Sequence, residues 1–233
     1  MFYFFFYLIC QFGQRYKILS NTNAVLQSFC TPPSNNHKTQ SMKSIKGTLT
    51  EQNLLKAFAG ESQARNRYSF FASAAKKEGY EQIAAVFFET AEQEQEHAKR
   101  FFKLMEGGLA TIYEATYPAG KIGTTAENLL SAALGEKEEW DILYPTFAQT
   151  AKDEGFIDIA AAFSNIASVE AEHERRYLKL LSRITHGDFF HRDNEIWWQC
   201  RNCGYIIKAT DAPILCPTCL HPKAYFEPMK TNY

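Results

Sequence analysis

Apolar residues recur along four stretches of the chain in steps of three and four positions. The second stretch has Ile83, Phe87, Thr90, Glu94, His97, Phe101 and Leu104, and the fourth has Ile159, Phe163, Ile166, Glu170, His173, Tyr177 and Leu180. Such spacing places the side chains on one face of an α-helix, which packs against neighbouring helices. The pattern therefore predicts a four-helix bundle.

The residues between these stretches predict where the helices begin and end. The capping-box sequences Thr48-x-x-Glu51 and Thr124-x-x-Glu127 are typical of helix starts, and Gly79 and Gly155 are typical of helix ends. We expect helices over about 48–79, 80–106, 124–155 and 156–185, with one long crossover before the third. Pro145 lacks a backbone N–H, so the third helix should kink there.

The two halves of the predicted bundle repeat one another. Gly60-Glu61 corresponds to Gly135-Glu136 at an offset of 75 residues, and Glu94-x-x-His97 corresponds to Glu170-x-x-His173 at an offset of 76. We therefore expect two similar helical hairpins that face each other across a pseudo-twofold axis.

The predicted inward faces carry ionisable groups, which are Glu61, Glu94, His97, Glu136, Glu139, Glu170 and His173. Burial of an unpaired carboxylate is costly, and the pattern places no Lys or Arg on these faces. A single Glu-x-x-His could be a surface pair, and a single inward His could be a core residue. Two metal ions would nearly neutralise the whole set, and this ligand mixture suits iron or manganese. The set therefore predicts a dinuclear metal centre.

Four cysteines near the C-terminus form two knuckles, Cys200-x-x-Cys203 and Cys216-x-x-Cys219. This spacing is typical of a four-thiolate site, which in a structural ribbon holds zinc. The surrounding Cys203-Gly-Tyr, Cys216-Pro and Pro222-Lys223 sequences resemble rubredoxin, a one-iron electron carrier, and favour iron.

Composition narrows the remaining possibilities. The chain has 233 residues and a formal net charge of −1, so it lacks the excess of positive charge that is typical of proteins that bind nucleic acid or an anionic membrane. Four of the six cysteines belong to the knuckles, which favours a reducing compartment, the cytoplasm. Residues 1–41 differ from the rest, with an apolar run too short to span a membrane followed by a polar run. They are a cleaved targeting segment, a disordered tail, or residues upstream of a true start at Met42. We expect domains over 42–187 and 188–233.

From Met42 onward, the chain resembles the rubrerythrin family. The resemblance rests on the segment from Glu61 to Tyr68, on both Glu-x-x-His motifs, on Glu136 and Glu139, and on the four cysteines. It implies an all-α four-helix ferritin-like bundle with a small C-terminal rubredoxin-like β/loop domain. It also implies two iron ions in a carboxylate-bridged site and one iron in the four-cysteine site. The 41-residue extension departs from the family pattern.

The resemblance further implies a non-haem di-iron peroxidase that reduces hydrogen peroxide to water and protects against oxidative stress. The electrons would come from a rubredoxin or an NAD(P)H-dependent reductase, in a homodimer or larger assembly. His97 and Glu139 would be alternative ligands in the reduced and oxidised states. Tyr68 and Tyr144 would orient carboxylates or donate protons, unless they only pack. A ferroxidase or iron-storage protein is the alternative function.

Overall fold

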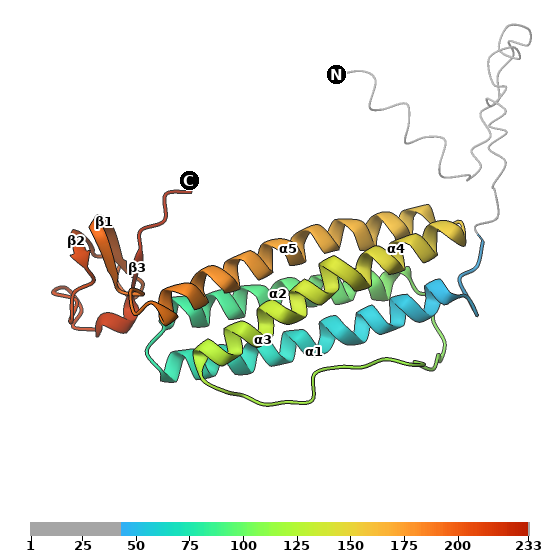
Figure 1. Cartoon of the computed structure of the whole chain (residues 1–233), viewed down its shortest axis with the longest axis horizontal. Coiled ribbons are helices and arrows are strands. Elements are labelled where there is room, and N and C mark those ends of the chain that lie inside the picture. The colour runs from blue at the N-terminus through green and yellow to red at the C-terminus, as the bar shows by residue number, and fades with distance from the viewer. Residues whose placement is uncertain (1–42, 233) are drawn as a thin grey trace, which may run out of the picture. The chain divides into compact units, whose positions relative to one another are not determined.

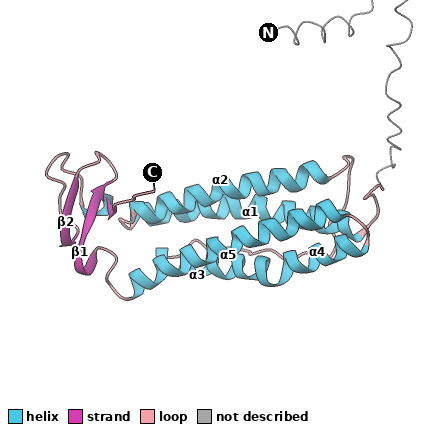
Figure 2. Ribbon diagram, turned by 90° about the horizontal axis from the view of Figure 1, so that it is seen from above, coloured by secondary structure: helices cyan, strands magenta, loops and turns pink. Residues whose placement is uncertain are grey.

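The computed structural model describes residues 43–232; the extension over 1–41 and the proposed start at Met42 lie outside the described residues. The bundle consists of α1 (Leu49–Lys77), α2 (Glu81–Leu104), α3 (Thr125–Glu138), α4 (Tyr144–Asp153) and α5 (Ile157–Thr185). α1 and α2 form one antiparallel hairpin, and α3, α4 and α5 form the other (Figure 1). Figure 2 shows the hairpins as two layers. The crossover between α2 and α3 returns along the bundle beside α1 (Figure 1). The sequence thus predicted the bundle and the crossover correctly.

The helix starts follow the predicted capping sequences. The Thr48 side chain accepts a hydrogen bond from the Glu51 backbone N–H at 3.1 Å, and Thr124 and Glu127 form a complete capping box. Each hairpin also caps the other. The Glu154 carboxylate accepts from the backbone of Thr50 in α1, and the Glu78 carboxylate accepts from the backbone of Thr125 in α3. These reciprocal contacts fix the register of the two hairpins.

The third predicted helix is not a kinked α-helix. A π-helical turn over Glu139–Leu143 separates α3 from α4, and the Tyr144 N–H donates to the Glu139 carbonyl five residues back. Pro145 has no N–H to donate into the preceding turn, and the π-turn lies directly upstream of it. The sequence predicted an irregularity in this helix but did not predict the π-turn.

Two aromatic clusters fill the bundle on either side of its centre. One contains Tyr68, Phe71, Phe87 and Tyr177, and the other contains Phe101, Tyr144, Phe147 and Phe163. Most of these rings are fully buried. The space between the clusters is therefore shielded from water along the bundle axis, and it is there that the polar residues of the core gather.

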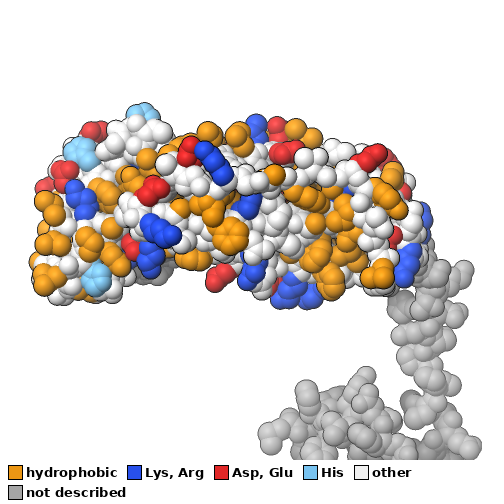
Figure 3. Space-filling model, turned by 90° about the horizontal axis from the view of Figure 1, so that it is seen from below, with side chains coloured by type: hydrophobic (Ala, Val, Ile, Leu, Met, Phe, Trp, Pro, Cys, Tyr) orange, Lys and Arg blue, Asp and Glu red, His pale blue; other side chains and the backbone are white. Residues whose placement is uncertain are grey.

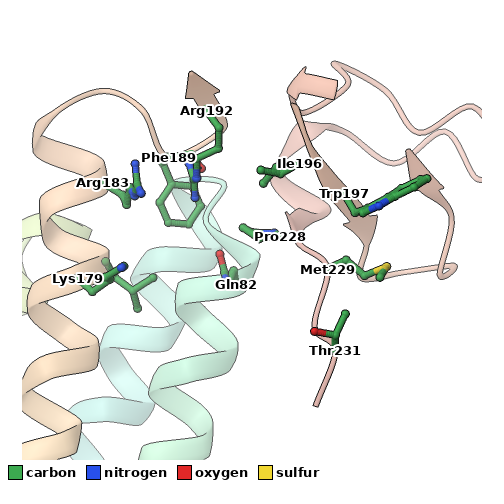
Figure 4. A pocket seen from close by; sticks show the side chains of 11 residues that line it. Gln82, Lys179, Arg183, Phe189, Arg192, Ile196, Trp197, Pro228, Met229 and Thr231 are labelled. Atoms are coloured by element: carbon green, nitrogen blue, oxygen red, sulfur yellow. The ribbon is translucent and has the colours of Figure 1, made fainter. Parts of the chain in front are cut away.

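A small three-stranded domain follows α5. Its antiparallel sheet has the order β2-β1-β3, from β1 (His191–Cys200), β2 (Ile206–Asp211) and β3 (Phe226–Pro228), and η2 (Lys223–Tyr225) precedes β3. Trp198, Cys200, Cys216 and Phe226 form its core. A cleft of about 460 Å³ separates the sheet from the ends of α2 and α5; Lys179 and Arg183 lie on the helical side, and Trp197 and Met229 lie opposite (Figure 4).

The surface of the described region matches the near-neutral charge. On the face in Figure 3, acidic and basic side chains are interspersed among hydrophobic ones. Among residues 43–232, no helix combines the length and the apolar character needed to cross a bilayer.

Candidate metal centres

The predicted ligands meet at the centre of the bundle as two overlapping groups. One consists of Glu61, Glu94, His97 and Glu170, and the other of Glu94, Glu136, Glu170 and His173. Within each group the ligand atoms lie within 4.8 Å of one another. Glu94 and Glu170 belong to both groups. The arrangement therefore offers two metal positions that share two carboxylates.

The shared carboxylates each direct one oxygen toward each histidine. His97 Nδ1 lies 2.9 Å from Glu94 Oε2 and 2.9 Å from Glu170 Oε1. His173 Nδ1 lies 3.2 Å from Glu94 Oε1 and 2.7 Å from Glu170 Oε2. Carboxylates that present separate oxygens to two positions are suited to bridge two metal ions.

The donor set fits metal ions better than it fits a protein hydrogen-bond network. Glu61, Glu94, Glu136, Glu170 and His173 are buried. Six of their polar atoms make no hydrogen bond, and these are Glu61 Oε2, Glu94 Oε1, Glu136 Oε2, both oxygens of Glu170 and His173 Nδ1. Buried polar groups are rarely left without a partner. Metal coordination would satisfy all six.

Protons compete with metal ions for this cluster. Burial lowers the pKa of His97, but the adjacent carboxylates of Glu170 and Glu94 outweigh it and raise that pKa to about 10. Burial, with the charge of Glu94, raises the pKa of Glu136 to about 8. Metals bind neutral imidazole and ionised carboxylate, so metal binding would release these protons.

The two predicted tyrosines hold the carboxylates that are not shared. Tyr68 donates to Glu136 Oε1 at 2.5 Å, and Tyr144 donates to Glu61 Oε1 at 2.5 Å. Each tyrosine belongs to one hairpin and contacts the carboxylate of the other. Burial raises the pKa of Tyr68 and of Tyr144 well above the usual value, so both are neutral donors. Both rings pack in the core, and both hydroxyls also hydrogen-bond to candidate ligand carboxylates.

Glu139 stands apart from the other predicted ligands. It belongs to neither group, it is only partly buried, and it lines a cavity of about 300 Å³ together with Tyr144. The helical spacing predicted that Glu139 would point inward beside Glu136. Burial first, and then the charges of Glu136, Glu170 and Glu94, raise the pKa of the Glu139 carboxyl well above its usual value, so this carboxyl lies near the cluster although it belongs to neither group.

Two residues that the sequence pattern missed support the cluster. Gln93 Oε1 lies 2.9 Å from His173 Nε2, and this contact directs the opposite ring nitrogen, Nδ1, toward the carboxylates. Arg67 corrects the expectation that no cation lies near the inward faces. Its Nε and Nη1 are buried, and its guanidinium lies 5.6 Å from the centre of the Tyr68 ring. Long side chains reach beyond the face on which their Cα lies, so Cα spacing cannot place them.

The four predicted cysteines converge in the small domain. Cys200 Sγ lies 3.8 Å from Cys219 Sγ, and Cys203 Sγ lies 3.6 Å from Cys216 Sγ. A tetrahedral ion with bonds of about 2.3 Å places its sulfurs at about this separation. Cys200 and Cys216 are buried, whereas Cys203 is exposed and Cys219 partly exposed. A hydrogen bond from the His221 backbone helps to lower the pKa of Cys219 to about 6, which favours the ligating thiolate.

Comparison with known proteins places both parts of the chain in one family. The sequence model described as Rubrerythrin matches residues 52–181, and the model described as the rubredoxin-like domain of rubrerythrin matches residues 198–227. The chain belongs to the rubrerythrin family. The Rubrerythrin of Porphyromonas gingivalis is 68% identical over 196 residues, which are 84% of this chain and 98% of that one. The Rubrerythrin of Nitratidesulfovibrio vulgaris is 52% identical over 192 residues, which are 82% of this chain and 100% of that one.

The fold agrees with solved structures of relatives. A structure of nigerythrin in a mixed-valence state aligns with a TM-score of 0.52 and 30% identity, and it covers 94% of this chain and 100% of that one. The ferritin-like bundle with its rubredoxin-like domain is therefore confirmed. Membership of the rubrerythrin family, an iron-binding oxidoreductase family, assigns the di-iron carboxylate site and the four-cysteine iron site as its cofactors.

Proposed function

We propose that this protein is a peroxidase that reduces hydrogen peroxide to water at the carboxylate cluster, with electrons that arrive through the four-cysteine centre. The observation that carries the proposal is that one chain combines a pair of metal positions with a thiolate site whose outer cysteines face solvent. A ferroxidase or iron-storage protein has no need of such a site, because its reaction consumes electrons from Fe(II) itself. The electron donor would be a rubredoxin or an NAD(P)H-dependent reductase, and the role would be protection against oxidative stress in the cytoplasm.

The residues around the cluster provide what the reduction requires. When bound, the two irons supply the two electrons. Tyr68 and Tyr144 are neutral and hydrogen-bonded to the carboxylates Glu136 and Glu61, so they hold protons at the edge of the reacting centre. The reaction consumes two protons along with the two electrons, and both phenols lie where a proton could be transferred.

The two histidines are held differently, which bears on the proposed exchange of ligands. The His173 side chain is 2% exposed and bonded to Gln93, whereas the His97 side chain is 14% exposed. We propose that His97 serves as a ligand in the reduced centre and Glu139 in the oxidised centre. A carboxylate stabilises the more positive ions, while a neutral imidazole suffices for the less positive ones.

The distance between the two centres within one chain favours electron transfer between subunits. From His173 to the end of α5 at Thr185 the helix extends about 18 Å, and the small domain lies beyond it. Electron tunnelling falls steeply with distance. We therefore propose a homodimer or larger assembly in which the four-cysteine site of one subunit approaches the carboxylate cluster of another.

The variant Cys219→Ser tests the proposed relay. It should abolish peroxide turnover driven by NADH and a reductase, while chemically reduced protein should still consume one equivalent of peroxide per cluster at the wild-type rate. Wild-type protein with and without the reductase is the control. Sustained NADH-driven turnover in Cys219→Ser would contradict the relay. Wild-type protein that oxidised added Fe(II) but did not reduce hydrogen peroxide would favour the ferroxidase alternative.

A further inference from the structure

The cavity beside Glu139 has walls from three separate parts of the chain. Gly60 and Arg67 line it from α1, Gly135 and Glu139 line it from α3 and the π-turn, and the crossover covers it with Tyr117. Tyr144, which holds the ligand Glu61, also lines it. The cavity therefore connects the crossover surface to groups that touch the metal ligands.

Two glycines keep side chains out of this cavity. Gly60 and Gly135 lie inside α1 and α3, each directly before a ligand glutamate, and neither has a positive φ. Glycine destabilises a helix interior relative to alanine, so the helices themselves would favour a side chain here. The glycines are better explained by the space that they leave.

Gly60 leaves open space beside Glu139 and Tyr117, here termed the passage. A Cβ at this position would lie 3.9 Å from Glu139 Oε1 and 3.9 Å from Tyr117 Cε1. It would therefore be in van der Waals contact with both the crossover tyrosine and the carboxylate, and it would fill space that is now open beside them.

The passage has a polar wall and an anchored cover. Arg67 places a positive charge in the wall, with two buried nitrogens that have no hydrogen-bond partner in the described structure. The Tyr117 hydroxyl donates to the Lys56 carbonyl at 2.9 Å, which ties the crossover to α1. A small polar molecule suits such a passage, and a bulky apolar one does not.

We propose that this cavity is the access and holding site for hydrogen peroxide, and that the gap between Tyr117 and Glu139 selects it over bulky organic hydroperoxides. The inference rests on the proposed peroxidase function, to which it adds a route and a substrate size. Peroxide oxygens would accept hydrogen bonds from the Arg67 side of the cavity, and a peroxide O–H would donate to Glu139.

Narrowing the passage with Gly60→Ala tests the route. We expect the second-order rate constant for oxidation of the diferrous protein by hydrogen peroxide to fall about tenfold, with unchanged iron content and an equal or higher melting temperature. Gly135→Ala is the matched variant, because its Cβ would lie 3.7 Å from the flexible end of Arg67 and outside the gap. It should gain the same helical stability and lose much less rate.

Opening the cover with Tyr117→Ala tests the selection. We expect the ratio of rate constants for cumene hydroperoxide and hydrogen peroxide to rise about tenfold, whereas Tyr117→Phe, which keeps the ring, should change the ratio less. A general folding defect would slow the reactions with both peroxides equally and leave the ratio of their rate constants unchanged.

Azide association with the iron-loaded protein is measured in parallel, so that access is followed without peroxide chemistry. Slower azide association in Gly60→Ala would support the route even if wild-type protein failed to reduce peroxide, a result that would overturn only the peroxidase proposal. If Gly60→Ala and Tyr117→Ala changed neither the azide rate nor the peroxide ratio, access would lie elsewhere and the inference would be wrong.

Discussion

The two hairpins of the bundle follow one plan but differ in length by a single residue. Glu61 and Glu136 are 75 residues apart, while Tyr68 and Tyr144 are 76 residues apart. The additional residue falls within the π-turn over Glu139–Leu143, whose hydrogen bond spans one residue more than an α-helical one. The π-turn absorbs the insertion without rotating the rest of the helix, so Tyr144 reaches Glu61 just as Tyr68 reaches Glu136.

From this comparison we propose that metal binding and reactivity depend on different residues. The hairpins share a Glu-x-x-His motif, a second carboxylate and a tyrosine, and the Glu and His residues make up the two candidate metal positions. What they do not share lies around one position. Ala64 is buried where the other hairpin has Glu139. Gln93, which contacts His173, corresponds to Val169, whose apolar side chain offers His97 no hydrogen-bond partner. The position held by Glu61 and His97 is therefore the less constrained of the two.

The largest effect expected from this comparison is the loss of metal when a shared carboxylate is removed. Glu94→Ala and Glu170→Ala should each lose most of the iron, because each carboxylate belongs to both ligand groups. Glu139→Ala should retain its iron but react with peroxide at least about tenfold more slowly, because Glu139 is an addition to the symmetric set. The measurement is iron per subunit beside the rate of peroxide oxidation of the diferrous protein.

Matched variants of the symmetric pair provide the control. Glu61→Ala and Glu136→Ala should each reduce iron binding to an intermediate and similar extent. Equal iron loss in every variant, Glu139→Ala included, would show that Glu139 is an ordinary ligand. An unchanged rate in Glu139→Ala would show that it is not a ligand at any stage.

Removing the inserted residue should make the hairpins equal in length. Deletion of Ile142, which is 58% exposed, should convert the π-turn into a regular α-helix like that of α1. We expect the bundle to fold and bind iron with a melting temperature a few degrees lower, and the peroxide reaction to slow to the rate of Glu139→Ala, because Glu139 would occupy the environment of Ala64.

A deletion elsewhere shows whether the π-turn is special. Removal of the exposed Asn165 from α5, where no π-turn can be shortened, should rotate Glu170 and His173 away from the cluster and abolish iron binding. If deletion of Ile142 also abolished iron binding, the π-turn would be part of the scaffold that holds the metals, and the separation of binding from reactivity would be wrong.

The sequence predicted the parts of this structure that depend on regular spacing. Helix faces and ligand glutamates follow from steps of three and four residues, and the helix ends follow from Thr48, Gly79 and their repeats. The change of offset from 75 to 76 was visible, but its location was not, because the choice between α and π hydrogen bonds depends on how both halves of the helix pack. Pro145 was the more obvious local signal.

Contacts between the hairpins could not be predicted in the same way. Glu78 and Glu154 occur in equivalent positions before Gly79 and Gly155, but nothing local shows that each caps a helix of the opposite hairpin. Gln93 and Arg67 have flexible side chains whose direction is fixed only by their surroundings. Sequence spacing therefore brought the candidate ligands and both tyrosines together and missed Gln93 and Arg67, which lie beside them.

A smaller effect is expected from loosening the better-fixed histidine. Gln93→Leu removes the hydrogen-bond partner of His173 Nε2, so affinity for one metal ion should fall about tenfold while the other remains bound. Titration of the protein with cobalt(II), followed by its visible absorption, measures the two affinities separately. Gln93→Glu retains an acceptor and should restore most of the affinity, whereas an equal loss at both positions would contradict a role confined to His173.

The smallest effect, on protein stability, is expected at Glu154 and Glu78, the carboxylates that each cap a helix of the opposite hairpin. Glu154 accepts hydrogen bonds from the backbone of Leu49 and from the backbone and hydroxyl of Thr50, whereas Glu78 accepts from the Thr125 backbone alone. The Thr125 hydroxyl has no partner within the described residues. Glu154→Gln should therefore destabilise the protein by about 1 kcal/mol, and Glu78→Gln by less.

The pH dependence of Glu154 checks that assignment. Burial raises the pKa of Glu154, but hydrogen bonds from Thr50 and Leu49 outweigh it and hold that pKa below its usual value. Because the carboxylate ionises more readily in the folded state, its stabilisation is complete above the unfolded-state pKa and is lost as the pH falls through the lower folded-state pKa. The melting temperatures of wild type and Glu154→Gln should differ by about 2–4 °C at pH 7 and converge in acid. Glu138→Gln, at an exposed position, should match wild type throughout. A difference that persisted unchanged in acid would mean that Glu154 stabilises the hairpins by packing and not by its charge.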